Sequence, residues 1–264
     1  MGFDGLKAMI GSRELKLGHF ILEFASPGLG HILANAGCDW FVFDTEHSGF
    51  GIETVKTMVR FAEAARLPMI VRVGAKDPHA ISRVCDAGAE GLMLPLVGTA
   101  EEARRIVCAI KYGPQGERGV ALALAHDNYR PGAVADKFAA ANRRTTVFLQ
   151  IETAEGVANA DAIAAVEGVD GLWLGQFDLT CSLGIPGQFD HPRFREALAT
   201  ILAACRRHRK SAGRLVADAA EGAAMAAAGW DFIAFSGDAW VYQAAVAAGI
   251  SAIRQAAQGG GRDG

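Results

Sequence analysis

The feature that most constrains the fold of this chain is an alternation of short β-rich runs with alanine-rich helical stretches, repeated eight times. Several β-rich runs are apolar almost throughout, as expected for parallel strands that are covered on both faces. The predicted strands are Lys16–Phe24, Trp40–Asp44, Pro68–Val73, Gly91–Leu96, Thr145–Glu152, Gly171–Gln176, Ser211–Val216 and Phe232–Ser236. This pattern favours a single (β/α)8 barrel (a TIM barrel). An open doubly wound sheet is the competing architecture, but no G-x-G-x-x-G sequence follows the first predicted strand.

Glycines mark the helix-to-strand junctions of this repeat. They stand in Ala36-Gly37-Cys38-Asp39, Ala87-Gly88-Ala89-Glu90, Glu167-Gly168-Val169-Asp170 and Ala228-Gly229-Trp230-Asp231. We expect these glycines to take the left-handed conformation that closes a helix. The chain is therefore divided into one barrel domain, residues 1–258, and a disordered tail, residues 259–264.

Composition excludes several classes of protein. The net charge is -3, so there is no basic excess of the kind that favours nucleic acid. No apolar run approaches the roughly 20 residues that cross a bilayer, and the first residues do not resemble a signal peptide. The five cysteines are dispersed without a C-x-x-C pair, which favours reduced thiols and a cytoplasmic protein.

Two carboxylates stand at the ends of neighbouring predicted strands, where a βα barrel carries its chemistry. Glu152 ends the fifth strand and Asp178 follows the sixth. Together they could hold a hard divalent cation, Mg²⁺ or Mn²⁺, that keeps water or substrate oxygens as its other ligands. The alternative is structural, because Asp178 could instead cap the N-terminus of a helix.

Charged groups at other strand ends complete the candidate site. Arg72, at the end of the third strand, offers a planar cationic fork for a carboxylate or enolate oxygen. His47 follows the second strand and is a candidate proton carrier. In the structural alternative, Arg72 pairs only with Asp44 or Glu46, and His47 is a solvated loop residue.

Several motifs resemble the HpcH/HpaI class II pyruvate aldolases, which are metal-dependent enzymes. The motifs are DTEH at 44–47, R-V-G-x-x-D-P at 72–78, DAGAEGLMLPLV at 86–97, GPQGERG at 113–119, LQIET at 149–153 and VDGLWLGQFDLT at 169–180. The resemblance runs in order through nearly the whole chain. It is to aldolases of the 4-hydroxy-2-oxoheptanedioate and 2-keto-3-deoxy-sugar-acid kind. It implies a βα barrel whose last helix is exchanged between subunits, in a homohexamer built as a trimer of dimers.

The resemblance also implies roles for individual residues. Glu152 and Asp178 would bind the metal, with Co²⁺ as a further candidate ion, and pyruvate would chelate it through carboxylate and keto oxygens. Arg72 would stabilise the enolate oxygen, with Gln150 beside it. His47 would act as acid and base, oriented by Asp86. The supporting residues are Asp44 and Glu46, the latter as a partner of metal-bound water. The substrates would be a ketoacid and an aldehyde.

Two departures from the family pattern leave the substrate open. Gln176 and Phe177 stand where many relatives have proline and a small residue, and Phe177 adds bulk near the ketoacid methyl. Hydroxypyruvate is therefore a second candidate donor beside pyruvate. Leu215 and Val216 fall in the region that contacts the aldehyde in relatives.

Three other functions compete with an aldolase. One is a lyase that acts on a CoA thioester, although the chain shows no obvious basic site for nucleotide phosphates. Another is a decarboxylating or cyclising enzyme that shares the metal enolate. The third is a non-catalytic barrel that binds a ketoacid, which the presence of Glu152, Asp178, Arg72 and His47 disfavours.

Overall fold

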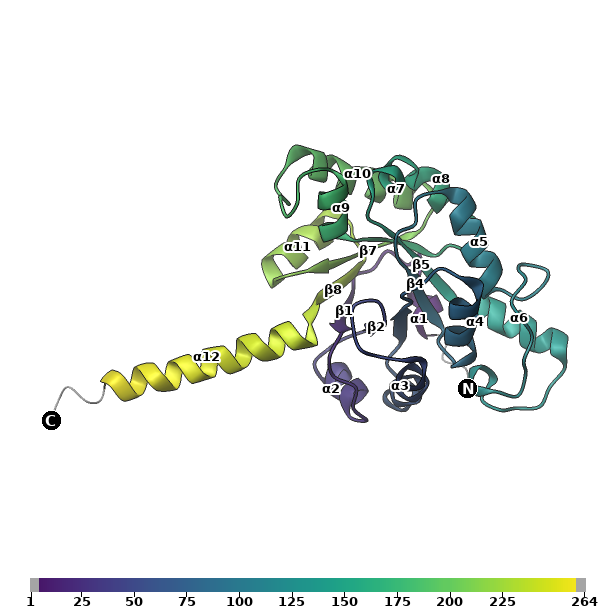
Figure 1. Cartoon of the computed structure of the whole chain (residues 1–264), viewed down its shortest axis with the longest axis horizontal. Coiled ribbons are helices and arrows are strands. Elements are labelled where there is room, and N and C mark those ends of the chain that lie inside the picture. The colour runs from purple at the N-terminus through teal and green to yellow at the C-terminus, as the bar shows by residue number, and fades with distance from the viewer. Residues whose placement is uncertain (1–4, 260–264) are drawn as a thin grey trace.

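The computed structural model describes residues 5–259 and contains a closed barrel of eight parallel strands, which are hydrogen-bonded in chain order (Figure 1). The strands are β1 (Lys16–Ile21), β2 (Trp40–Asp44), β3 (Met69–Arg72), β4 (Gly91–Leu94), β5 (Thr146–Ile151), β6 (Gly171–Leu174), β7 (Ser211–Val216) and β8 (Phe232–Gly237). Closure by pairing of β1 with β8 confirms the predicted barrel and excludes the open sheet.

Helices between the strands surround the barrel, whereas α1 precedes β1 and α12 follows β8 (Figure 1). The helices are α1 (Gly5–Met9), α2 (Leu29–Asn35), α3 (Ile52–Ala65), α4 (Pro78–Asp86), α5 (Ala100–Ile110), α6 (Val134–Arg144), α7 (Ala154–Ala158), α8 (Ala160–Ala164), α9 (Gln176–Ser182), α10 (Pro192–Arg207), α11 (Ala219–Ala228) and α12 (Asp238–Gly259), with a short 3₁₀ helix at Ala125–Asp127. Gly37, Gly88, Gly168 and Gly229 have φ values of 91°, 106°, 90° and 95°. The predicted left-handed junctions are therefore confirmed.

The barrel interior is a packed aromatic core. Inward-facing side chains gather there, including Trp40, Phe148, Trp173 and Phe232, and all four are at most 2% exposed. Gly213 is required at this level, because a Cβ on it would lie 2.2 Å from the Trp173 ring. Alternate residues of the same strands face outward and form a second apolar layer with the surrounding helices. The core therefore fills the barrel up to the carboxyl ends of the strands, where polar residues begin.

Five strands (β1, β3, β4, β5 and β6) end earlier than the sequence predicts, and after β1 and β4 the next backbone groups bind side chains instead of the sheet. The N–H groups of Leu22, Glu23 and Phe24 donate to the carboxylate of Asp238, which ends β1 at Ile21. After β4, the Leu96 N–H donates to a carboxylate oxygen of Glu152, at 2.6 Å.

The last helix, α12, extends away from the barrel instead of packing against it (Figure 1). It reaches Gly259, one residue beyond the predicted end of the domain, and the rest of the predicted tail lies outside the described residues. Between residues 5 and 259, the structure contains no helix that is long and apolar enough to span a membrane.

Candidate active site

Strand alternation places the candidate site directly on top of the aromatic core. Every second residue of a β-strand faces the barrel interior. Above Val42 on β2 the next inward residue is Asp44, and above Ile70 on β3 it is Arg72. On β5 the same progression above Phe148 gives Gln150 and then Glu152. Polar side chains from β2, β3 and β5 therefore meet at the carboxyl-terminal end of the barrel, which we call the mouth.

A carboxylate fork holds Arg72. Its Nε donates to Asp44 Oδ1 at 2.8 Å and its Nη2 to Asp44 Oδ2 at 2.6 Å, and both side chains are buried. Glu46 Oε2 lies 3.3 Å from the same Nε. Arg72 therefore pairs with both Asp44 and Glu46, as the structural alternative proposed. The pairing still leaves Nη1 without an acceptor among the described residues, so a guanidinium edge is available to a ligand.

His47 is the most exposed member of the group. Its side chain is 60% exposed, and its Nε2 lies 3.8 Å from Glu46 Oε2. The backbone of this segment is fixed by Asp44, whose carboxylate accepts the N–H groups of Glu46 and His47. The segment thus has a defined path, while the imidazole remains accessible from solvent.

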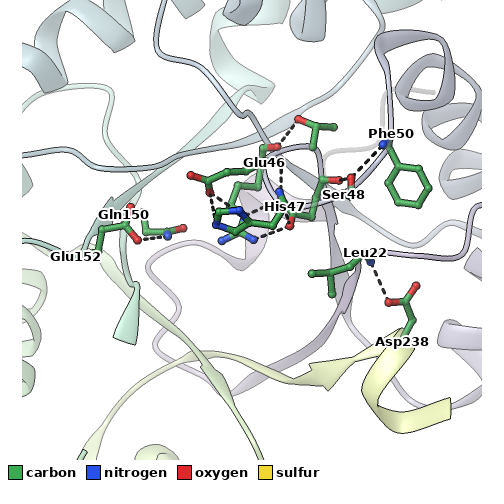
Figure 2. Close-up of polar contacts among 11 residues, drawn as sticks. Leu22, Glu46, His47, Ser48, Phe50, Gln150, Glu152 and Asp238 are labelled. Carbon is green, nitrogen blue, oxygen red and sulfur yellow. Dashed lines mark hydrogen bonds and ion pairs between the residues drawn. The ribbon is translucent and has the colours of Figure 1, made fainter. Parts of the chain in front are cut away.

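Glu152 is almost completely buried, at 1% exposure, as is Asp44 at 0%. Its Oε1 accepts the Leu96 N–H, and its Oε2 accepts a hydrogen bond from Gln150 Nε2. Figure 2 shows this Gln150–Glu152 pair on one side of the mouth and Glu46 with His47 on the other. Gly175 of the β6–α9 junction leaves the room that Glu152 occupies, because a Cβ there would lie 2.1 Å from Oε2.

Asp178 lies in the first turn of α9, on the exposed side of the mouth. The residue that caps this helix is Gly175, so Asp178 does not fill the N-cap role that the structural alternative gave it. Burial, with repulsion from Asp178 and Glu46, raises the pKa of Glu152. Burial also raises the pKa of Glu46, and repulsion from Asp44 and Asp178 raises it further. Three carboxylates, from the ends of β2, β5 and β6, therefore share one electrostatic environment.

This set of carboxylates and buried acceptors fits a divalent cation. Gln150 Oε1 is a buried acceptor without a hydrogen bond, and Glu46 Oε2 has only its ion pair with Arg72 and no hydrogen bond. Mutual repulsion of the carboxylates also costs free energy until a positive charge neutralises it. Within residues 5–259, no three His, Cys, Asp or Glu side chains form a ready-made ligand cluster. An ion held by Glu152 and Asp178 would therefore take its remaining ligands from water or substrate, which suits Mg²⁺ or Mn²⁺.

One sequence-predicted site residue, Asp86, is not brought to the mouth within this chain, and a second, Val216, belongs to the outer apolar layer but lines the cavity beside Phe177. Asp86 is the last residue of α4, which runs from the mouth toward the opposite rim, and its carboxylate binds Arg118 Nη2 at 2.5 Å. No contact between Asp86 and His47 is formed within the described residues. Val216 is 1% exposed in the outer apolar layer, whereas its neighbour Leu215 packs toward the inner core. Strand alternation thus favours Leu215 over Val216 as a residue that faces the interior.

Phe177 lies at the mouth as predicted but points into an open region. Its side chain is 62% exposed and packs edge-to-face on Phe189, with ring centroids 5.3 Å apart. The two rings belong to a 680 Å³ apolar cavity between the end of β7 and the first turns of α12. The cavity is next to the site and is bounded by α12 as well as by the barrel.

Sequence reasoning missed three residues that shape the mouth. Leu96 supplies the backbone N–H that binds Glu152, Lys76 Nζ donates to the Leu96 carbonyl at 2.6 Å, and Asp238 holds the segment after β1. No pattern in the sequence identifies the first two, because their contacts join different strand ends. Asp238 had a weak signal, since it is a carboxylate directly after the last predicted strand.

Comparison with known proteins identifies the family of this chain. The family model for the HpcH/HpaI aldolase/citrate lyase family matches residues 18–245. A 5-keto-4-deoxy-D-glucarate aldolase from Klebsiella pneumoniae is 34% identical over 239 residues, which are 90% of this chain and 92% of that one.

Solved structures of the same kind superpose closely. An HpcH/HpaI aldolase from Desulfitobacterium hafniense has a TM-score of 0.89 and 32% identity, and the match covers 94% of this chain and 96% of that one. The citrate synthase SbnG has a TM-score of 0.86 and 30% identity, with 97% of this chain and 99% of that chain covered. Sequence and structure together show that this chain belongs to the HpcH/HpaI aldolase/citrate lyase family.

Proposed function

We propose that the protein is a divalent-metal-dependent aldolase that reversibly cleaves a 4-hydroxy-2-oxo acid into an aldehyde and either pyruvate or hydroxypyruvate. The observation that carries the proposal is the grouping of Glu152, Asp178 and Glu46 around the buried Arg72–Asp44 fork at the barrel mouth. The 5-keto-4-deoxy-D-glucarate aldolases to which the chain is similar support a sugar-derived ketoacid as substrate.

Glu152 and Asp178 would hold the cation, which we expect to be Mg²⁺ or Mn²⁺, with Co²⁺ as a further candidate. When bound, the cation would act as a Lewis acid toward the keto group of the substrate. Glu46 would accept a hydrogen bond from a water at the site, since its Oε2 is a buried acceptor without a hydrogen bond.

Arg72 would stabilise the negative charge that develops during cleavage. When the C3–C4 bond breaks, its electron pair forms the C2–C3 double bond, and the π electrons of the keto group move onto its oxygen, which becomes an enolate oxygen. The free guanidinium edge can donate to that oxygen, while Asp44 holds the group in place. A donor that is fixed before the reaction stabilises the developing charge without reorganising. Gln150, whose Nε2 is bound to Glu152, would line the same side of the ketoacid.

His47 would move the proton. Cleavage requires loss of the proton from the C4 hydroxyl as the aldehyde carbonyl forms, and a neutral imidazole can accept it. Glu46 Oε2, 3.8 Å from Nε2, is placed to stabilise the imidazolium that results. The proton that His47 removed, or one exchanged for it with solvent, then returns to C3 of the enolate, so that the retro-aldol reaction balances. Phe177, which is adjacent to Asp178 in α9, would influence the size of the donor that fits.

We also propose that the protein is a homo-oligomer, a hexamer built as a trimer of dimers in which α12 packs on another subunit. Support comes from the apolar residues that α12 exposes, among them Trp240, Tyr242, Ile250 and Ile253. The cytoplasm is the expected compartment, and the five free cysteines are consistent with it.

Exchange of the pyruvate methyl protons in heavy water tests the function without knowledge of the aldehyde. The protein is stripped of metal, divided, and incubated with pyruvate with or without Mg²⁺ or Mn²⁺, and each sample is chelated again before the NMR spectrum. We expect exchange only with metal, and none in Asp178→Ala. Asp190→Ala, which removes a fully exposed carboxylate on the next loop, is the matched control and should retain exchange. Absence of metal-dependent exchange with both pyruvate and hydroxypyruvate would contradict the proposal.

A further inference from the structure

Leu96 adopts a backbone conformation that its own side chain does not explain. Its φ is +54°, in the left-handed region that residues other than glycine rarely occupy. The side chain is 47% exposed, so burial of the isobutyl group does not hold the residue there. This conformation directs the Leu96 N–H toward Glu152, and the N–H donates to Oε1 at 2.6 Å. Polar contacts must therefore maintain it.

Lys76 supplies the contact on the other side of Leu96. It comes from the β3–α4 connection, and its Nζ donates to the Leu96 carbonyl oxygen at 2.6 Å. The same ammonium forms an ion pair with Glu102, in the first turn of α5. Glu102 Oε2 in turn accepts the N–H of Gly98 at 2.9 Å. The Lys76–Glu102 pair thus fixes both Leu96 and Gly98.

We propose that Lys76 is a positioning residue for Glu152. The Lys76–Glu102 pair clamps the β4–α5 connection, so that the Leu96 N–H holds the Glu152 carboxylate in its cation-binding orientation. This inference rests on the proposed metal site and deepens it. Hydrogen bonds of this kind orient a ligand before the ion arrives and strengthen its binding. Lys76 itself touches neither the ion nor the substrate.

The sign of the effect separates positioning from simple electrostatics. Lys76 is a cation near a cation site, so its charge alone repels the metal. If Lys76 acted only through its charge, Lys76→Met would tighten metal binding. If Lys76 acts through Leu96, the same substitution releases the peptide and weakens metal binding.

The test measures the Mn²⁺ dissociation constant by electron paramagnetic resonance and by calorimetry. We expect Lys76→Met to weaken binding about tenfold, at the lower end of the range for residues that orient a ligand. Lys76→Arg can still donate to Leu96 and pair with Glu102, and should recover most of the affinity. Arg105→Met removes a cation from the exposed Arg105–Glu101 ion pair on α5, the helix that carries Glu102. It serves as the matched control and should leave the affinity unchanged. Thermal unfolding of each variant in chelator establishes that the barrel is folded.

A second readout does not involve metal. In chelated protein, amide hydrogen exchange at Leu96 should be faster in Lys76→Met than in wild type or Arg105→Met. Unchanged or tighter Mn²⁺ binding in Lys76→Met overturns the inference, and so does unchanged exchange at Leu96. If the wild-type protein itself binds no Mn²⁺, or if Glu152→Gln binds it equally well, the proposed metal site fails instead and the inference falls with it.

Discussion

Several electrostatic effects oppose the ionised form of Glu152. It is buried and lies within the influence of two further carboxylates, and the nearest guanidinium is already committed to Asp44. Each of these effects raises the free energy of the ionised form. The same arrangement favours binding of a divalent cation, since one ion relieves the repulsion among all three carboxylates. A buried carboxylate whose ionised form destabilises the folded protein is typical of a functional site.

Substitution of Glu152 by glutamine tests this account at the level of one residue. In chelator, we expect Glu152→Gln to raise the melting temperature, because a neutral amide replaces a repelled carboxylate. Added Mg²⁺ should stabilise the wild type and leave the variant unchanged. Glu155→Gln, at an exposed position on α7, is the control and should behave like wild type. Equal stabilisation of both proteins by Mg²⁺ would remove Glu152 from the metal site.

His47 should affect proton transfer without affecting the metal. We expect His47→Ala to lower kcat for cleavage of a 4-hydroxy-2-oxo acid by roughly 10² to 10⁴, the usual contribution of a general base. Its Mn²⁺ dissociation constant should stay within about threefold of wild type, because His47 is not a proposed ligand. Steady-state kinetics and calorimetry measure the two quantities on the same preparation. An unchanged kcat would exclude His47 as the base.

At the scale of elements, the connection between α5 and β5 has its own buried charge. Lys111 is 3% exposed, and its Nζ donates to the carbonyl oxygens of Asn142, at 2.7 Å, and Thr145, at 2.8 Å, where α6 ends. A cation at a helix C-terminus satisfies carbonyl groups that have no partner within the helix. Burial, with a contribution from Lys7, lowers the pKa of Lys111 from 10.5 to about 8.

This shift predicts a pH-dependent stability. Below pH 8 Lys111 is charged in both folded and unfolded chains, and the folded state bears the desolvation cost. Between about pH 8 and 10.5 the unfolded state binds more protons, so the unfolding free energy should rise with pH. Relative to Lys111→Met, the wild type should gain up to about 3 kcal/mol across this window. Urea denaturation of both proteins at pH 7, 9 and 10.5 measures the difference, and parallel pH profiles would contradict it.

At the scale of the whole molecule, α12 is the helix that extends away from the barrel (Figure 1). Tyr242, Val246, Ile250 and Ile253 are exposed at spacings of four, four and three residues, so they form one apolar stripe along the helix. The anchor is Asp238, whose carboxylate binds the segment after β1 and fixes where the helix leaves the barrel. A stripe of this kind is expected to pack on another subunit.

Charge placed on the stripe should disrupt the assembly. We expect Ile250→Glu to shift the molar mass in light scattering after size exclusion toward smaller species. Gln255→Glu adds the same charge on a different face of α12, and should leave the mass of the wild type unchanged. Equal masses for all three proteins would show that the stripe is not part of an interface. A monomeric wild type would exclude the proposed hexamer directly.

The sequence by itself determined the barrel and most of the groups at its mouth. Eight β-rich runs, several of them apolar almost throughout, alternate with helices, and four of the helix-to-strand junctions carry glycine. This pattern favours a closed parallel barrel, since few other arrangements bury both faces of every strand. The carboxyl ends of parallel strands meet at one rim, so Arg72, Glu152 and Asp178 could be assigned to one site from their positions alone. Their chemistry follows from residue type.

Tertiary structure decided which neighbours these groups have. The chain contains no local signal that Leu96 turns its N–H to Glu152, because that contact joins residues 56 apart. The direction of α4, which takes Asp86 away from His47, and the inward turn of Leu215 depend likewise on how elements pack. The path of α12 is also set by packing, through Asp238 and the segment after β1. Local patterns specify elements, whereas contacts between distant segments specify how each functional group is oriented.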